Sequence, residues 1–136
     1  MKIFRNIKSV DVPVLSDGQL YIYVLENSPQ GNIKIGRTSN LQQRLRALSG
    51  SNGGGNHIVK IAVSEPTYLY TLEHIAHSKF DKYRIDGTEW FDGSHVGFVE
   101  AYSFVDELFS RDDYELCNRV RKEYTLKFGP SKVKEH

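Results

Sequence analysis

Residues Leu20 to Arg37 read LYIYVLENSPQGNIKIGR, and this stretch decides the fold. Its first part, up to Leu25, is rich in aromatic and β-branched residues and leads into a turn with proline and glycine, which predicts a strand followed by a turn. A second short strand, beginning at Ile33, completes an antiparallel β-hairpin. Because successive side chains of a strand point to opposite faces, we expect Tyr23 and Lys34 on the same side of this hairpin.

Helical patterns and one further strand follow the hairpin. Thr38, Ser39 and Asn40 supply capping oxygens for a short helix over 41–50, and the glycine-rich stretch 51–56 predicts a loop. The pattern then predicts a third strand over 57–65, a long helix over 67–83 after Pro66, and a closing strand or extended segment over 87–91. A last helix is expected from Phe98 to about Tyr124.

Length and composition limit the class of protein. At 136 residues the chain is long enough for one domain with a real core. It contains no apolar run of the roughly 18 residues that a membrane span requires, so we expect no membrane association. The basic start lacks the apolar block of a secretory signal. A single cysteine, Cys117, excludes an internal disulfide and suits a cytoplasmic protein.

The charges are unevenly distributed. A net charge of +1 argues against a protein that simply coats nucleic acid, but no acidic residue occurs from Asn27 to Ser64. We interpret this basic block as a surface for nucleic acid; the alternative is chance clustering of charge on a solvated face. His57 either contacts a phosphate or only starts the third strand. The residues predicted to bind nucleic acid are Arg37, Arg46, His57 and Lys60.

Four side chains point to hydrolysis of a phosphodiester. Tyr23, Lys34, Arg44 and Glu73 together supply a group to activate water, cations for the phosphate and a hard oxygen ligand for a divalent metal. Each has an ordinary reading when taken alone. Tyr23 is then a packing residue, Lys34 a solvated lysine, Arg44 an exposed helix former, and Glu73 a surface partner of His77. We interpret the set as catalytic.

The order of these motifs resembles the GIY-YIG nuclease superfamily. The resemblance rests on Tyr21-Ile22-Tyr23, on Lys34-Ile35-Gly36 after ten intervening residues, and then on Thr38, Asn40, Arg44 and a helical Glu73. The sequence RIDGTEWF at Arg84–Phe91 is similar to a phage-associated and mobile-element branch. The chain departs from the pattern in three places. Tyr21 replaces a glycine, Lys34 replaces a tyrosine, and the late asparagine has no counterpart except Glu89 or a backbone carbonyl.

The resemblance implies an α/β (α+β) fold with a small, three-stranded, mainly antiparallel sheet flanked by helices. It divides the chain into an N-terminal arm (1–19), a nuclease core (20–92), a C-terminal helical extension of the same domain (93–126) and a tail (127–136). It also implies that Tyr23 orients or deprotonates water, that Arg44 holds the scissile phosphate, and that Glu73 binds one Mg²⁺ or Mn²⁺. Lys34 would stabilise the Tyr23 phenolate, because an ordinary tyrosine is a poor base at neutral pH. DNA would be cut to 3′-hydroxyl and 5′-phosphate ends.

The leading hypothesis is therefore a metal-dependent DNA endonuclease that acts by a one-metal mechanism. The alternative is a nucleic-acid-binding module of the same fold with weak or lost catalysis, and a third hypothesis is an interaction protein that uses its C-terminal helices. The sequence does not distinguish DNA from RNA as the substrate. Because we see no appended base-reading motif, any selectivity would come from DNA structure, a partner protein or a homodimer formed through the C-terminal helices.

Overall fold

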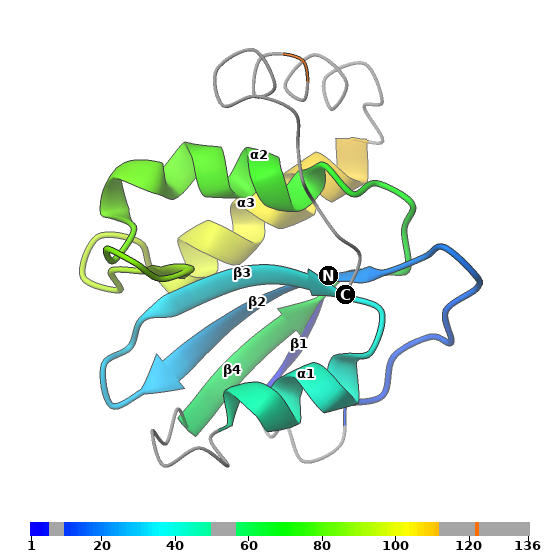
Figure 1. Ribbon diagram of the computed structural model, residues 1–136, viewed down its shortest axis with the longest axis horizontal. Helices are drawn as coiled ribbons and strands as arrows, with labels where there is room; N and C mark the ends of the chain where they lie inside the picture. Colours follow the sequence, from blue (N-terminus) through cyan, green and yellow to red (C-terminus); the bar gives the residue numbers. More distant parts are fainter. Residues whose placement is uncertain (6–9, 50–56, 112–121, 123–136) are drawn as a thin grey trace.

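The computed structural model describes residues 1–5, 10–49, 57–111 and 122. In this part of the chain, five strands form one sheet, and every pair of neighbouring strands is antiparallel (Figure 1). The strand order is β1-β4-β2-β3-β5. The strands are β1 (Lys2–Phe4), β2 (Tyr21–Ser28), β3 (Ile33–Thr38), β4 (His57–Val63) and β5 (Trp90–Phe91).

The expectation of a three-stranded sheet is wrong. The expected strands are present as β2, β3 and β4, but β1 pairs with β4 at one edge and β5 pairs with β3 at the other. Both additional strands have at most 3 residues. Strand β5 falls within the segment 87–91, where the sequence predicts a closing strand or extended segment. Strand β1 is too short to carry an alternating pattern, and its partner β4 is distant along the chain. The fold is α+β, with a five-stranded antiparallel sheet.

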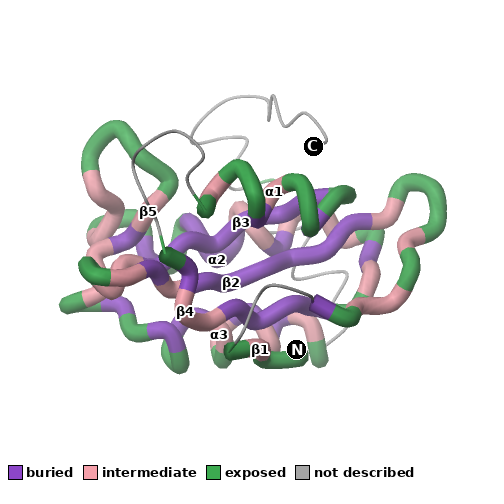
Figure 2. Tube along the Cα trace, turned by 90° about the horizontal axis from the view of Figure 1, so that it is seen from below, coloured by how far each residue is buried: buried purple, intermediate pink, exposed green. Residues whose placement is uncertain are grey.

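Helices cover both faces of the sheet (Figure 1). Helix α1 (Leu41–Leu48) lies on one face, and α2 (Leu72–Phe80) and α3 (Phe98–Arg111) lie together on the other. Alternation along β2 supplies both cores, because Tyr23 and Leu25 pack on the α1 side while Ile22 and Val24 pack on the α2 side. Figure 2 shows the central strand β2 buried over most of its length between these layers.

Helix α2 begins later than the sequence predicts. A helix was expected over 67–83, but it starts at Leu72 and ends at Phe80, where a 3-10 helix η1 (Asp81–Tyr83) follows. The cause lies at Thr67, whose backbone N–H and C=O both bond to Leu20, with N···O distances of 3.0 Å. Because both backbone groups of Thr67 are bonded to a strand partner, Thr67 cannot also start a helix. Pro66 therefore does not occupy the first helical turn.

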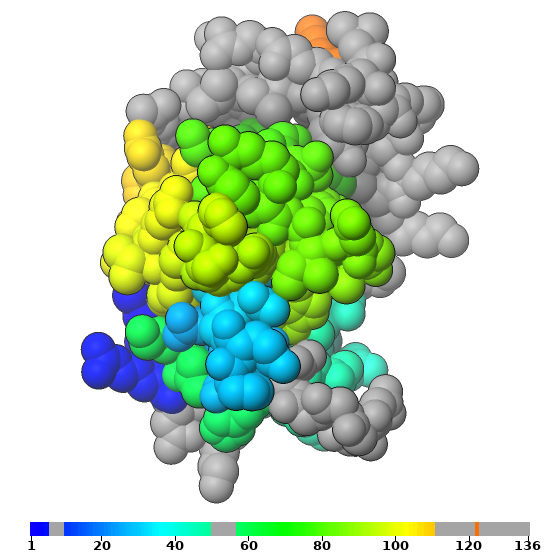
Figure 3. Space-filling view, turned by 90° about the vertical axis from the view of Figure 1, so that its left-hand side faces the viewer, coloured from blue at the N-terminus to red at the C-terminus, as the bar shows by residue number. Residues whose placement is uncertain are grey.

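The segment after β5 packs on the turn of the β2–β3 hairpin. In Figure 3 the yellow residues of this segment lie directly against the blue residues of the hairpin turn. The backbone N–H of Gly93 donates to the Asn32 side-chain oxygen at 3.1 Å, and a Cβ at Gly93 would overlap the Gly31 carbonyl. This contact fixes β5 and the residues before it against the outer edge of β3.

Three expectations fall outside the described residues: the loop over 51–56, the continuation of the last helix to about Tyr124, and the tail over 127–136. Cys117 also lies there. Within residues 1–5, 10–49 and 57–111, none of the helices has the length and apolarity needed to cross a lipid bilayer.

Candidate functional site

Tyr23 and Gly36 are direct cross-strand partners in β2 and β3. Tyr23 is 1% exposed, and its ring lies against Gly36 so closely that a Cβ at position 36 would overlap the phenol. Burial raises the pKa of Tyr23, and the nearby charges of Glu73 and Glu89 raise it further, although Arg44 opposes them. The Tyr23 phenol is therefore neutral at physiological pH.

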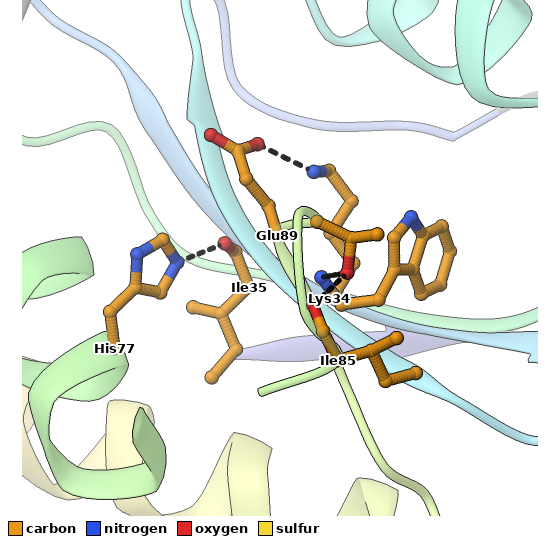
Figure 4. Close-up of polar contacts among 7 residues, drawn as sticks. Lys34, Ile35, His77, Ile85 and Glu89 are labelled. Atoms are coloured by element: carbon orange, nitrogen blue, oxygen red, sulfur yellow. Dashed lines mark hydrogen bonds and ion pairs between the residues drawn. The ribbon is translucent and has the colours of Figure 1, made fainter. Parts of the chain in front are cut away.

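Lys34 projects from the same face of the hairpin as Tyr23, as the alternation predicts. Its ammonium forms an ion pair with Glu89, with 2.7 Å between Nζ and Oε2 (Figure 4). It also lies 5.8 Å from the centre of the Trp90 ring. The Lys34 hydrogen bond and charge lower the pKa of Glu89. The cation that acts on Tyr23 is Arg44, whereas Lys34 holds Glu89 as an ionised carboxylate.

Helix α2 lines the outer edge of β3 where β5 stops pairing. In the described structure β5 pairs with β3 only at Ile33 and Lys34. Beyond that point, His77 Nε2 donates to the Ile35 carbonyl at 2.6 Å (Figure 4), and the Arg37 backbone N–H donates to the Glu73 carboxylate. Four residues of helix rise about 6 Å and two residues of strand about 6.6 Å, so this spacing lets Glu73 and His77 follow the strand edge.

The burial of Glu73 has an electrostatic consequence. The pKa of Glu73 is raised to about 7, chiefly by burial and also by the Glu89 charge, although the charges of Arg37 and Lys34 and the Arg37 backbone hydrogen bond act to lower it. A carboxylate in this environment favours a neighbouring cation, because the ionised form is poorly solvated. Without a neighbouring cation, Glu73 is therefore only partly ionised at neutral pH.

Arg44 reaches the same region from the α1 side. Asn40 caps α1 by accepting a hydrogen bond from the Gln43 N–H at 3.1 Å, which fixes where the helix starts. Leu41 and Leu45 pack into the core beside Tyr23. Arg44 shares their face of the helix, is partly exposed, and its charge acts on the pKa of both Tyr23 and Glu89.

The structure thus places Tyr23, Lys34, Arg44 and Glu73 around the edge of β3, where Tyr23 interacts electrostatically with Arg44 and Glu73, and Glu73 with Lys34. Glu89 completes this group, which we call the β3-edge cluster. The sequence indicated Glu89 only as a substitute for a missing asparagine. Its partner Lys34 lies 55 positions away in the chain, so no local pattern marks the pair.

The residues predicted to bind nucleic acid are scattered. Arg37 is 6% exposed and donates from Nη1 to the Tyr70 carbonyl at 3.0 Å. Lys60 lies on the opposite face of the sheet, with 5.8 Å between its ammonium and the centre of the Phe98 ring. His57 pairs with Ser28, roughly 17 Å along β2 from Tyr23 at about 3.3 Å per residue. Of these four residues, only Arg46 lies on α1, the helix that carries Arg44, and its side chain is exposed to solvent.

The donor atoms limit the kind of metal site that can form. Among the described residues, no group of three or more His, Cys, Asp or Glu side chains is placed to hold a metal ion. Glu73 nevertheless fits a single Mg²⁺ or Mn²⁺, because its carboxylate is a hard oxygen donor and Mg²⁺ keeps several of its waters when bound. A closed tetrahedral zinc site does not fit this donor set.

The sequence decides the family. A model of the T5orf172 domain matches residues 20–111, which include the hairpin, α1, α2 and the GTEWF segment. The chain belongs to the T5orf172 domain family. This is a nuclease-like, DNA-binding type of domain related to GIY-YIG-type folds, and it indicates a phage-related protein. No curated protein and no solved structure matches the chain.

The expected membership of the GIY-YIG superfamily is therefore wrong, since the matching family model is a different one. The two departures in the hairpin, Tyr21 for glycine and Lys34 for tyrosine, fall on the residues that give GIY-YIG its name. The shared order of motifs agrees with the relation of this domain to GIY-YIG-type folds.

Proposed function

We propose that this T5orf172 domain is a metal-dependent DNA endonuclease that hydrolyses phosphodiester bonds with one divalent ion. The observation that carries the proposal is the β3-edge cluster, in which a carboxyl group with a raised pKa, an arginine and a buried tyrosine share one electrostatic environment. Catalytic sites are where burial and neighbouring charges shift pKa values in this way. The family supports the DNA substrate at the coarser level of a nuclease-like, DNA-binding domain.

Glu73 would hold the ion. A bound Mg²⁺ or Mn²⁺ would supply Lewis-acid stabilisation of the charge that develops on the phosphate and the leaving oxygen. Glu73 gains from such an ion, because the positive charge favours the ionised carboxylate that burial disfavours. Its hydrogen bond from the Arg37 backbone leaves the carboxylate fixed at the strand edge.

The remaining members of the cluster bind and orient the reactants. Arg44 presents a planar guanidinium that matches two phosphate oxygens. Tyr23, neutral because of its burial, orients the attacking water by hydrogen bonding and does not remove its proton. The proton passes to Glu89, which Lys34 keeps ionised.

Nicking of supercoiled plasmid tests this proposal. Wild-type protein should nick DNA with Mg²⁺ or Mn²⁺ and be inactive with chelator, and Arg44→Ala should lose activity. Gln42→Ala is the control, because Gln42 lies on the same helix, is solvent-exposed and has no predicted part in binding nucleic acid. No nicking with either metal, or equal activity of the two variants, would contradict the proposal. Cleavage of a single-stranded RNA, measured with the same metals, decides between DNA and RNA.

A second candidate is a nucleic-acid-binding module without catalysis. It is favoured by the fact that both carboxylates of the cluster already have partners: Glu73 accepts from the Arg37 backbone and Glu89 is paired with Lys34. Salt-sensitive DNA binding with no nicking at any metal concentration would select this candidate.

A further inference from the structure

A pocket of about 210 Å³ lies where β3 leads into α1. Gln19, Arg37, Thr38, Ser39 and Tyr70 contribute to its lining, together with Gly18 and Leu20. Arg37 links the pocket to the β3-edge cluster, because the same guanidinium is the charge that most lowers the pKa of Glu73. The pocket is otherwise separate from the residues of the proposed reaction.

The walls of the pocket are tied together. Arg37 donates to the Tyr70 carbonyl at 3.0 Å, and the Tyr70 hydroxyl donates to the Gly18 carbonyl. The Gln19 side-chain oxygen accepts from the Ser16 N–H at 2.8 Å, which holds its amide group in place. These bonds connect three segments that are distant in the sequence, so the pocket is formed before any ligand binds.

The chemistry of the lining favours an anion. Among the described residues that line the pocket, Arg37 is the one charged side chain, and there is no carboxylate. Arg37 is more than nine-tenths buried, so its charge is weakly solvated and acts strongly at the pocket. Thr38 and Ser39 add hydroxyl groups, and the start of α1 adds the partial positive charge of a helix N-terminus.

Size and aromatic geometry argue for a phosphate over a base. The volume corresponds to about seven waters at ~30 Å³ each, which is below the range of pockets for drug-sized ligands. The Arg37 guanidinium lies 5.7 Å from the centre of the Tyr70 ring. One side of the single aromatic ring in the lining is therefore covered by Arg37, which leaves it poorly placed to stack on a nucleobase.

We propose that this pocket binds a phosphate group of the nucleic-acid strand, next to the phosphate that is cut. The identity of the strand rests on the proposed function, but the phosphate subsite concerns binding and not cleavage. Its position supports the assignment, because Thr38 and Ser39 lead directly to Asn40, whose carbonyl accepts from the Arg44 N–H at 3.1 Å. The pocket therefore lies one helical turn along the backbone from Arg44.

A pair of isosteric variants tests the subsite. Gln19→Glu places a carboxylate in the pocket and keeps the oxygen that accepts from Ser16. Gln30→Glu makes the same change in the exposed hairpin turn, at the opposite end of β3. Binding of a fluorescent single-stranded oligonucleotide and of its duplex is measured in chelator, so that cleavage plays no part. We expect Gln19→Glu to weaken binding about tenfold and Gln30→Glu less than about twofold.

A scan of methylphosphonate substitutions, each of which removes the charge of one phosphate, identifies the contact. With wild-type protein, substitution at one non-scissile phosphate should weaken binding about tenfold, and with Gln19→Glu it should have no further effect. If inorganic phosphate competes with the oligonucleotides and every methylphosphonate substitution weakens binding equally, the pocket is a site for free phosphate and the proposal is overturned. Equal binding by Gln19→Glu and Gln30→Glu, with both variants folded by circular dichroism, would also overturn it. If Gln19→Glu weakens binding but the wild-type protein never nicks DNA, only the nuclease proposal is contradicted.

Discussion

The ring of Tyr23 lies against the backbone of Gly36, its direct partner across the β2–β3 hairpin, and occupies the space that a Cβ at position 36 would need. Both residues are buried. The glycine therefore lets a large aromatic side chain lie flat between the sheet and α1. The Tyr23 hydroxyl reaches the β3-edge cluster because position 36 carries no side chain.

Gly36→Ala tests this packing. We expect it to destabilise the fold by about 1–3 kcal/mol, since the added Cβ overlaps the Tyr23 phenol and this buried ring would have to shift. Gly97→Ala is the matched control: a Cβ there meets no atom within 4 Å. The free energy of unfolding in urea measures both. Adding Tyr23→Ala to Gly36→Ala should recover part of the loss relative to the sum of the single changes, and simple additivity would contradict the contact.

The lowered pKa of His77 should reduce the stability of the protein in acid. Burial lowers the pKa of His77 to about 4, from an ordinary value of 6.5. As pH falls below 6.5, His77 binds a proton in the unfolded chain but not in the folded protein, so its contribution to stability decreases down to about pH 4. The contribution is about 3 kcal/mol over this window. His77→Gln keeps a donor for the Ile35 carbonyl and should abolish this contribution in urea unfolding; an unchanged acid slope would refute the assignment.

In metal-free protein, Glu73 should change the free energy of unfolding with pH in the opposite direction. Its folded pKa of about 7 lies above the ordinary value of 4.5, so stability decreases as pH rises from about 4.5 to 7. The slopes of Glu73 and His77 oppose each other between about pH 4.5 and 6.5, and the wild type should show a flat profile there. Glu73→Gln in chelator should be more stable than wild type at pH 8 by about 3 kcal/mol at most. A less stable Glu73→Gln at that pH would show that the ionised carboxylate is well solvated.

Lys34 should set the pH dependence of activity through Glu89. The Lys34 hydrogen bond and charge lower the pKa of Glu89, so Lys34→Met should raise it and move the acidic limb of the pH–rate profile to higher pH. The effect on stability should be small, because the Glu89 side chain is 68% exposed. An unchanged acidic limb would remove Glu89 as the proton acceptor, whereas a shifted alkaline limb alone would return that role to Tyr23.

The sequence predicts those parts of the fold whose interactions are local. The alternation around Tyr23 and Lys34 places both on one face of the hairpin, and Asn40 caps α1 within three residues of its partner Gln43. Period and capping are properties of a few adjacent residues, so they can be read without the rest of the chain.

What the sequence does not predict depends on distant partners. Strand β1 forms because β4 offers an edge, and α2 starts late because Thr67 pairs with Leu20. Arg37 lies in the basic block, yet the register of β3 turns its side chain to the opposite face from Tyr23, where it is buried. Lys60 is likewise separated from Arg44 by the sheet. Burial and electrostatic neighbours are set by tertiary packing, which a pattern of charges along the chain does not encode.

The central claim is that Glu73 holds the ion used to cut DNA, and the rate of plasmid nicking by Glu73→Gln in Mg²⁺ tests it most directly. Glutamine keeps an oxygen to accept from the Arg37 backbone N–H but loses the negative charge, so the fold is retained while the ion is not. We predict a rate at least about a hundredfold below wild type, with DNA binding in chelator unchanged. A rate equal to that of wild type would contradict the claim.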